Sequence, residues 1–117
     1  MADVTIAQRA ICRDHAADFA PPATGSRVGV ALQTLGLMPL NGTRIAEHGN
    51  VCGWYLWGGE ATSDDPDFYQ PLCVEHVPDR CPLALSFLGL PPGWRFLTDG
   101  ESVDVWFDRN LLESSRP

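Results

Sequence analysis

Cysteine and histidine side chains that could bind a metal ion or act as nucleophiles gather in the middle of the sequence. Cys73, His76 and Cys81 lie close together, and Cys52 or His48 could complete a set of four ligands. Zinc favours such nitrogen and sulfur donors. The spacing is not that of a zinc finger or ribbon, and Cys52 falls in a predicted strand with no partner two residues away. We therefore predict buried thiols, a hydrogen-bonded histidine, no metal and no cofactor; the alternative is a small metal-dependent or thiol enzyme using Cys73, His76 and Cys81.

A second group of chemically capable residues is acidic. Glu60, Asp64, Asp65 and Asp67 crowd one segment whose glycines, serine and proline predict an exposed loop. Their oxygens could bind calcium, but the segment does not match the twelve-residue calcium loop. A basic protein surface fits them better as a ligand. Trp57 lies just before the loop, and we expect it to be partly exposed and to act with the four acidic residues as a partner-binding site.

Signatures of other chemistries are missing from the sequence. It contains no Gly-x-Ser-x-Gly elbow, no phosphate-binding loop and no dinucleotide fingerprint. We therefore predict that the protein is not an enzyme and has no catalytic residues. Fifteen acidic and eight basic residues give a net charge of -7, which repels phosphate backbones. Nucleic acid is therefore disfavoured as a partner.

The elements that position these residues form one domain spanning residues 1–117, since this length suits a single core. Apolar residues at helical spacing predict a helix within residues 1–20. Strands are predicted over residues 27–35 and 51–57, with a turn at Pro39, Asn41 and Gly42 between them. Because both faces of residues 51–57 are apolar, that strand is expected at the centre of the sheet.

The last third of the chain predicts a short helix and a hairpin. The helix packs through Leu83, Phe87 and Leu88, and the two strands of the hairpin flank the turn pair Asp99-Gly100. The predicted fold is therefore α+β: an antiparallel or mixed sheet of about four to five strands, packed by the N-terminal helix and the short second helix, with a C-terminal β-hairpin.

The compartment can also be predicted from the sequence. Charged residues interrupt the first twenty positions, so no secretory signal is expected there. No run approaches the roughly 18 apolar residues that span a membrane. The four cysteines lack the short spacings of a disulfide framework. We expect a cytoplasmic protein that binds no membrane; its oligomeric state is left open.

Four sequence strings, taken in order, resemble a known family. They are GWYLWGGE at 53–60, DPDFYQPL at 65–72, LPPGWRFL at 90–97 and DVWFD at 104–108. Together they resemble a bacterial immunity-protein family of polymorphic toxin systems, the thirty-third in the usual catalogue and first described as a domain of unknown function. The resemblance covers roughly residues 27–112. It implies a non-enzymatic cytoplasmic protein that binds and neutralises a cognate toxin domain encoded beside it, and it does not identify the toxin.

Overall fold

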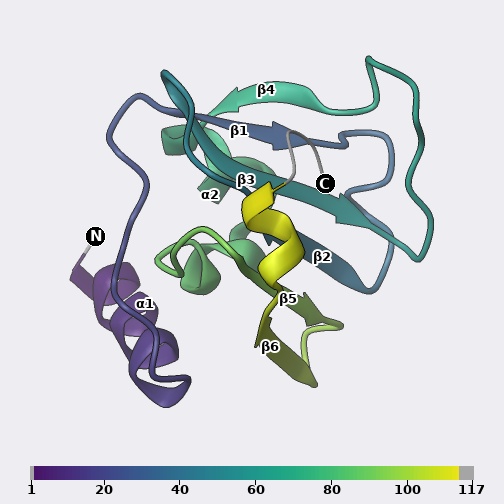
Figure 1. The fold of residues 1–117 in the computed structure, drawn as a ribbon. Helices are drawn as coiled ribbons and strands as arrows, with labels where there is room; N and C mark the ends of the chain where they lie inside the picture. Colours follow the sequence, from purple (N-terminus) through teal and green to yellow (C-terminus); the bar gives the residue numbers. More distant parts are fainter. Residues whose placement is uncertain (1, 114–117) are drawn as a thin grey trace.

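One six-stranded sheet organises the chain in the computed structural model, which describes residues 2–113 (Figure 1). The strand order is β4-β1-β3-β2-β5-β6. The strands are β1 (Arg27–Val30), β2 (Leu40–Arg44), β3 (Val51–Gly58), β4 (Gln70–Cys73), β5 (Trp94–Thr98) and β6 (Val103–Phe107). The helices are α1 (Ala2–Asp14), α2 (Val77–Arg80) and the 3-10 helices η1 (Val74–His76), η2 (Pro82–Phe87) and η3 (Arg109–Glu113).

The sheet is mixed, because β1 and β3 run parallel while every other neighbouring pair is antiparallel. The predicted α+β class, the N-terminal helix, the central position of β3 and the C-terminal hairpin are confirmed. The predicted number of strands is wrong, since the sheet has six. In place of the predicted short second helix, the chain forms three short helices in succession, η1, α2 and η2, and Pro82 is the first residue of η2.

The strand β2 replaces the turn that the sequence predicts at Asn41 and Gly42. It lies between β3 and β5 and pairs antiparallel with both. A Cβ atom on Gly42 would come within 2.0 Å of the Phe96 ring, so the ring packs directly on the backbone of β2. The Asn-Gly pair therefore serves close packing inside a sheet rather than reversal of the chain.

The other strand that the sequence did not predict is β4, a short strand at the edge of the sheet next to β1. It contains Pro71, which has no amide hydrogen to donate. An edge strand tolerates proline because one side of its backbone needs no hydrogen-bond partner within the sheet. Because proline is rare in strands, the sequence pattern did not predict β4. The same proline protects the edge from pairing with a further strand.

The main core lies between one face of the sheet and the layer formed by α1 and η2. Trp54 of β3 is fully buried, and its indole N–H donates to the Leu88 carbonyl at 3.0 Å. Phe87 stacks on Phe96 with 4.2 Å between ring centroids. Gln8 fastens α1 to this layer by donating to the Leu85 carbonyl. No helix within residues 2–113 is long and apolar enough to cross a bilayer.

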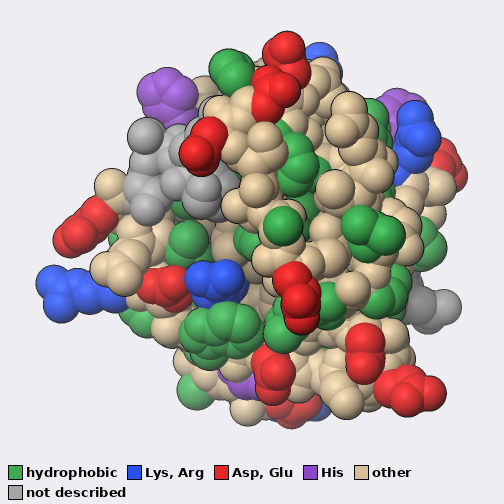
Figure 2. Space-filling model, turned by 90° about the vertical axis from the view of Figure 1, so that its right-hand side faces the viewer, with side chains coloured by type: hydrophobic (Ala, Val, Ile, Leu, Met, Phe, Trp, Pro, Cys, Tyr) green, Lys and Arg blue, Asp and Glu red, His purple; other side chains and the backbone are tan. Residues whose placement is uncertain are grey.

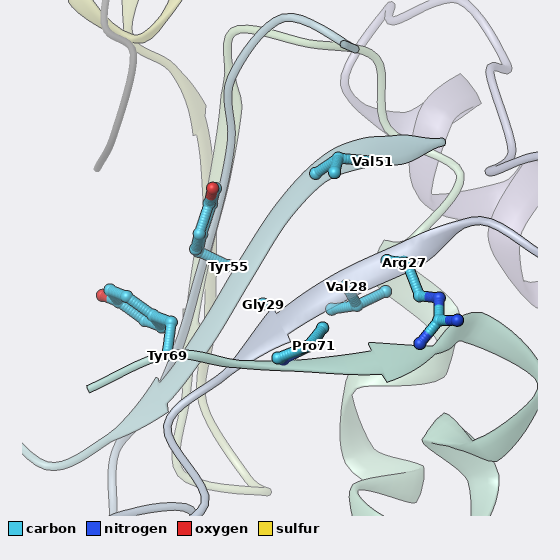
Figure 3. A pocket seen from close by; sticks show the side chains of 7 residues that line it. All are labelled: Arg27, Val28, Gly29, Val51, Tyr55, Tyr69 and Pro71. Atoms are coloured by element: carbon cyan, nitrogen blue, oxygen red, sulfur yellow. The ribbon is translucent and has the colours of Figure 1, made fainter. Parts of the chain in front are cut away.

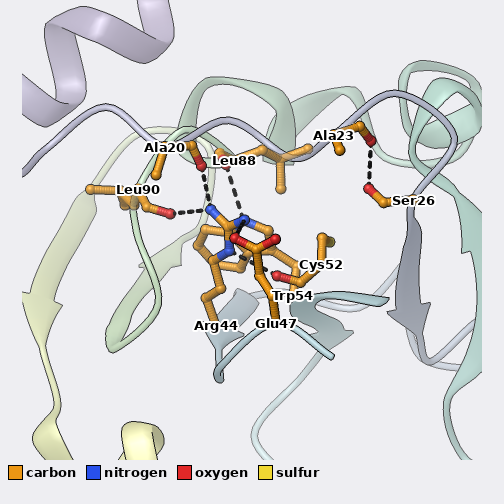
Figure 4. Close-up of polar contacts among 9 residues, drawn as sticks. All are labelled: Ala20, Ala23, Ser26, Arg44, Glu47, Cys52, Trp54, Leu88 and Leu90. Atoms are coloured by element: carbon orange, nitrogen blue, oxygen red, sulfur yellow. Dashed lines mark hydrogen bonds and ion pairs between the residues drawn. The ribbon is translucent and has the colours of Figure 1, made fainter. Parts of the chain in front are cut away.

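Arg44 at the end of β2 is a fully buried charge that joins distant segments (Figure 4). Its Nε donates to the Cys52 carbonyl at 3.0 Å, and its Nη1 donates to the carbonyls of Ala20 and Leu90. Its Nη2 lies 3.6 Å from a Glu47 carboxylate oxygen. Burial lowers the pKa of the Arg44 guanidinium, but its ordinary value is so high that the group stays charged at neutral pH.

Candidate functional site

The predicted acidic loop is the long connection between β3 and β4, at the right of Figure 1. Glu60, Asp64, Asp65 and Asp67 are all exposed in it. Figure 2 views the molecule from this side and shows acidic side chains spread widely, hydrophobic side chains between them and fewer basic ones. The loop residues therefore form part of a broadly negative surface.

Short-range hydrogen bonds shape the acidic loop. The Asp65 amide donates to Ser63 Oγ at 3.1 Å, and the Asp67 amide donates to Asp65 Oδ1 at 2.9 Å. Gln70 Nε2 then donates to the Asp67 carbonyl. These bonds close successive turns and leave the carboxylates at the surface.

Aromatic rings fasten the end of the loop to the sheet. Tyr69 contacts Tyr55 of β3 edge to face, with ring centroids 4.9 Å apart, and also contacts Trp57 at 6.3 Å. Phe68 adds a further contact with Tyr69. Trp57 is only 7% exposed, so the expectation of a partly exposed tryptophan is wrong. Tyr69, at the end of the loop, packs against Trp57. Trp57 therefore supports the acidic loop through this contact.

Exposed apolar side chains do lie beside the loop, but they come from the connection between β1 and β2. The Gly59 amide donates to the Pro39 carbonyl at 2.9 Å, and a Cβ on Gly59 would lie 3.4 Å from Leu37 Cδ1. Leu37 and Met38 are both more than half exposed. The sequence analysis missed these two residues, although an apolar pair directly before a predicted turn was the available signal.

A small cavity of about 150 Å³ opens on the sheet next to the aromatic contacts (Figure 3). Tyr55 and Tyr69 lie toward one end, Arg27 lies at the other end and Pro71 lies between them. The Tyr55 ring packs so closely on Gly29 that a Cβ there would lie 2.5 Å from Tyr55 Cδ1. The cavity has one cationic side chain, two tyrosines and otherwise apolar walls.

The residues considered for metal or thiol chemistry have different environments. Cys81 is buried, and burial raises its pKa, which keeps the thiol protonated and weakly nucleophilic. Cys73 Sγ donates to a Glu75 carboxylate oxygen at 3.0 Å, and His76 is exposed. Within residues 2–113, no group of three or more His, Cys, Asp or Glu side chains is placed to hold a metal ion.

Glu75 joins Cys73 to the segment before β1, because its carboxylate accepts hydrogen bonds from both Cys73 and Gly25. Both of its carboxylate oxygens accept from the Gly25 amide, at 2.9 and 3.1 Å. The hydrogen bond from Cys73, together with that amide, lowers the pKa of the Glu75 carboxyl. All four cysteines are free. Burial also raises the pKa of Cys12 and Cys52, so these thiols resemble Cys81 in reactivity.

Comparison with protein families gives a match over most of the chain. A family model described as the Imm33-like domain matches residues 7–108, which include most of α1 as well as every strand of the sheet. Neither a search of curated proteins nor a search of solved structures found a match. The match confirms the resemblance that the strings at 53–60 and 90–97 indicate, and its length covers most of the chain. The chain belongs to the Imm33-like family, whose name is that of an immunity protein.

Proposed function

We propose that the protein is a cytoplasmic immunity protein without enzymatic activity, which neutralises a cognate toxin domain by binding it through the acidic loop. The observation that carries the proposal is that the carboxylates of Glu60, Asp64 and Asp67 are exposed and take part in no ion pair within the described residues. The ion pairs of residues 2–113 join Arg13 to Asp14, Arg44 to Glu47 and Arg95 to Asp108, and none of them includes Glu60, Asp64 or Asp67. These charges are therefore available to an external partner.

The proposed surface combines charge with apolar contact area. Toxin domains that act on nucleic acid present basic clefts, and a chain with a net charge of -7 is steered toward such a cleft. Leu37 and Met38 beside the loop supply the apolar contacts that slow dissociation. Trp57 contributes indirectly, because it packs under Tyr69 and holds the loop against β3. Covering the cleft excludes the substrate, so inhibition needs no chemistry by the immunity protein.

Binding kinetics against the toxin encoded by the neighbouring gene test the acidic loop. Replacing Asp64, Asp65 and Asp67 together by asparagine should slow association by about 10-fold at low salt and flatten its salt dependence. Asparagine keeps the side-chain oxygen with which Asp65 accepts the Asp67 amide, so the loop keeps its shape. The matched control replaces the exposed Asp14, Asp18 and Asp79 by asparagine, which removes the same charge elsewhere.

The two triple variants give separable outcomes. A larger effect of the loop triple than of the control triple supports the acidic loop as the interface. Equal effects would mean that only net charge matters, and unchanged kinetics in the loop triple would place the interface elsewhere. Leu37→Ala should speed dissociation, whereas Leu32→Ala, an exposed apolar residue in the same connection, should leave dissociation unchanged.

The enzyme alternative based on Cys73, His76 and Cys81 has no observation in its favour. Cys81 is buried with a raised pKa, and the Cys73 thiol donates a hydrogen bond to Glu75 within a structural contact. The unpaired cysteines instead support the cytoplasmic part of the proposal, because thiols stay reduced in that compartment.

A further inference from the structure

The two edges of the sheet differ in how well they are protected. The β4 edge contains Pro71, which cannot donate to an added strand. The β6 edge, Val103–Phe107, contains no proline, glycine or lysine and pairs only with β5 among the described strands. Val103, Trp106 and Phe107 are 49%, 39% and 48% exposed. An exposed apolar edge of this kind is a template for pairing with another strand.

Hydrogen bonds at the ends of the hairpin identify which backbone groups of β6 face outward. The Asp108 amide donates to the Gly93 carbonyl at 2.7 Å, and the Asp99 amide donates to the Ser102 carbonyl. In an antiparallel pair, hydrogen-bonded positions alternate along the strand. Asp104 and Trp106 therefore bond to β5. Val103, Val105 and Phe107 direct their amide and carbonyl groups toward the open edge.

We infer that β6 pairs antiparallel with β6 of a second copy of this chain, about a two-fold axis at Val105, so that the two sheets become continuous. In this register Val105 faces Val105 of the other copy and Val103 faces Phe107, and each of these pairs joins outward-facing backbone groups. The side chains at these positions share one face of the sheet, so apolar residues meet apolar residues.

The charges on the strand select this register over its neighbours. With the axis at Val105, each Asp104 faces Trp106 of the other copy, and that Trp106 lies beside its own Arg95, whose guanidinium carbon is 5.0 Å from the indole. An axis at Asp104 would place two aspartates directly opposite each other, and an axis at Trp106 would place Asp104 opposite Asp108. Like charges directly opposite destabilise a strand pair. Of these three registers, the one centred on Val105 is the one that places no two aspartates opposite each other.

Net charge opposes this association. Each copy carries a charge of -7, so the copies repel one another, and screening by salt reduces that repulsion. The dimer should consequently become tighter as the salt concentration rises. This dependence is opposite to that expected for an acidic protein binding a basic partner.

Disulfide trapping tests the register. In a Cys73→Ser background, which leaves only buried native cysteines, Val105→Cys should give a disulfide-linked dimer on mild oxidation. Facing residues of a hydrogen-bonded pair have Cα atoms about 5.5 Å apart, within disulfide range. Val103→Cys is the matched control, since the two copies of residue 103 would be about 13 Å apart at roughly 3.3 Å per residue. Equal trapping of both variants, or none for Val105→Cys, would overturn the inference.

Sedimentation equilibrium tests the dimer without cross-linking. The unmodified chain should show a concentration-dependent dimer that tightens between low and high salt. Val103→Asp should weaken dimerisation by at least about 10-fold, because it replaces the apolar contact with Phe107 by a charge. Leu32→Asp adds the same charge at an exposed apolar position outside β6 and should have a much smaller effect. A chain that stays monomeric at every concentration, including one whose β6 pairs only with the toxin, contradicts the inference.

Discussion

Arg44 and the acidic loop place charge in opposite environments. Arg44 is fully buried and donates to carbonyls of residues 20, 52 and 90, which are far apart in the sequence. The acidic loop is exposed, and the hydrogen bonds among Ser63, Asp65, Asp67 and Gln70 join residues only two or three positions apart. The buried Arg44 charge therefore joins segments that are far apart in the sequence. The hydrogen bonds of the acidic loop stabilise only turns within the loop.

This difference indicates which charges the fold needs and which it leaves for a partner. A buried guanidinium without its acceptors would be costly, and so would buried carbonyls without their donor. Exposed carboxylates stay solvated in the folded and unfolded chain alike, so they contribute little to stability. Substitutions in the two regions should therefore separate stability from binding.

The largest effect is expected at the buried charge. Arg44→Met fills a similar volume but removes the donors to two buried carbonyl groups and one part-buried carbonyl group, and should lower the free energy of unfolding by about 3 kcal/mol. Arg13→Met, at an exposed position of α1, should change it by less than about 0.5 kcal/mol. Urea denaturation followed by circular dichroism measures both. Equal stabilities would mean that the buried hydrogen bonds contribute nothing net.

A smaller effect is expected for an exposed carboxylate that has structural hydrogen bonds. The bond from Cys73, followed by that from the Gly25 amide, lowers the pKa of Glu75 in the folded chain below its ordinary value of 4.5. The unfolded chain therefore binds the proton first as the pH falls. The stabilisation is present above about pH 4.5 and is lost as the pH falls through the lower folded pKa.

In the Glu75→Gln variant, the free energy of unfolding should therefore fall less steeply between about pH 5 and pH 3 than in the unmodified chain. Glu60→Gln removes an equal charge from the acidic loop, at a carboxylate that accepts no hydrogen bond from another described residue, and should keep the steeper loss of the unmodified chain. Denaturation midpoints measured across this pH range distinguish the two. Identical pH profiles for the two variants would contradict a structural role for Glu75.

The smallest effect is expected in the loop itself. Replacing Asp64, Asp65 and Asp67 by asparagine should change the free energy of unfolding by less than about 0.5 kcal/mol, since the three side chains are exposed. The same variant is expected to slow toxin association markedly. Thermal and urea unfolding check the first expectation. A destabilisation comparable with that of Arg44→Met would show that the loop charges belong to the fold after all.

The sequence predicted an element correctly where its turn residues or apolar pattern match the position that the element takes in the sheet. The Asp-Gly turn predicted the hairpin of β5 and β6, and the apolar faces of residues 51–57 predicted a central strand. In β2 the Asn-Gly pair carries a turn signal, but packing of Phe96 on Gly42 decides the structure. That contact joins residues more than fifty positions apart, so no local pattern reveals it.

The candidate site was predictable in part for the same reason. The exposure of Glu60 and Asp64 follows from local composition, and the loop lies where it was predicted. The burial of Trp57 depends on the return of the chain at Tyr69, and the position of Leu37 beside the loop depends on the contact between Gly59 and the connection from β1 to β2. Their role in binding a toxin stays a prediction.

The strand order carries a consequence for how the chain folds. The pairs β2–β3 and β5–β6 join neighbouring segments and can form early, because little loop entropy is lost. The parallel pair β1–β3 and the pair β2–β5 need distant segments to meet, which slows folding. We expect the two hairpins to form first and their docking along β2 and β5 to limit the rate.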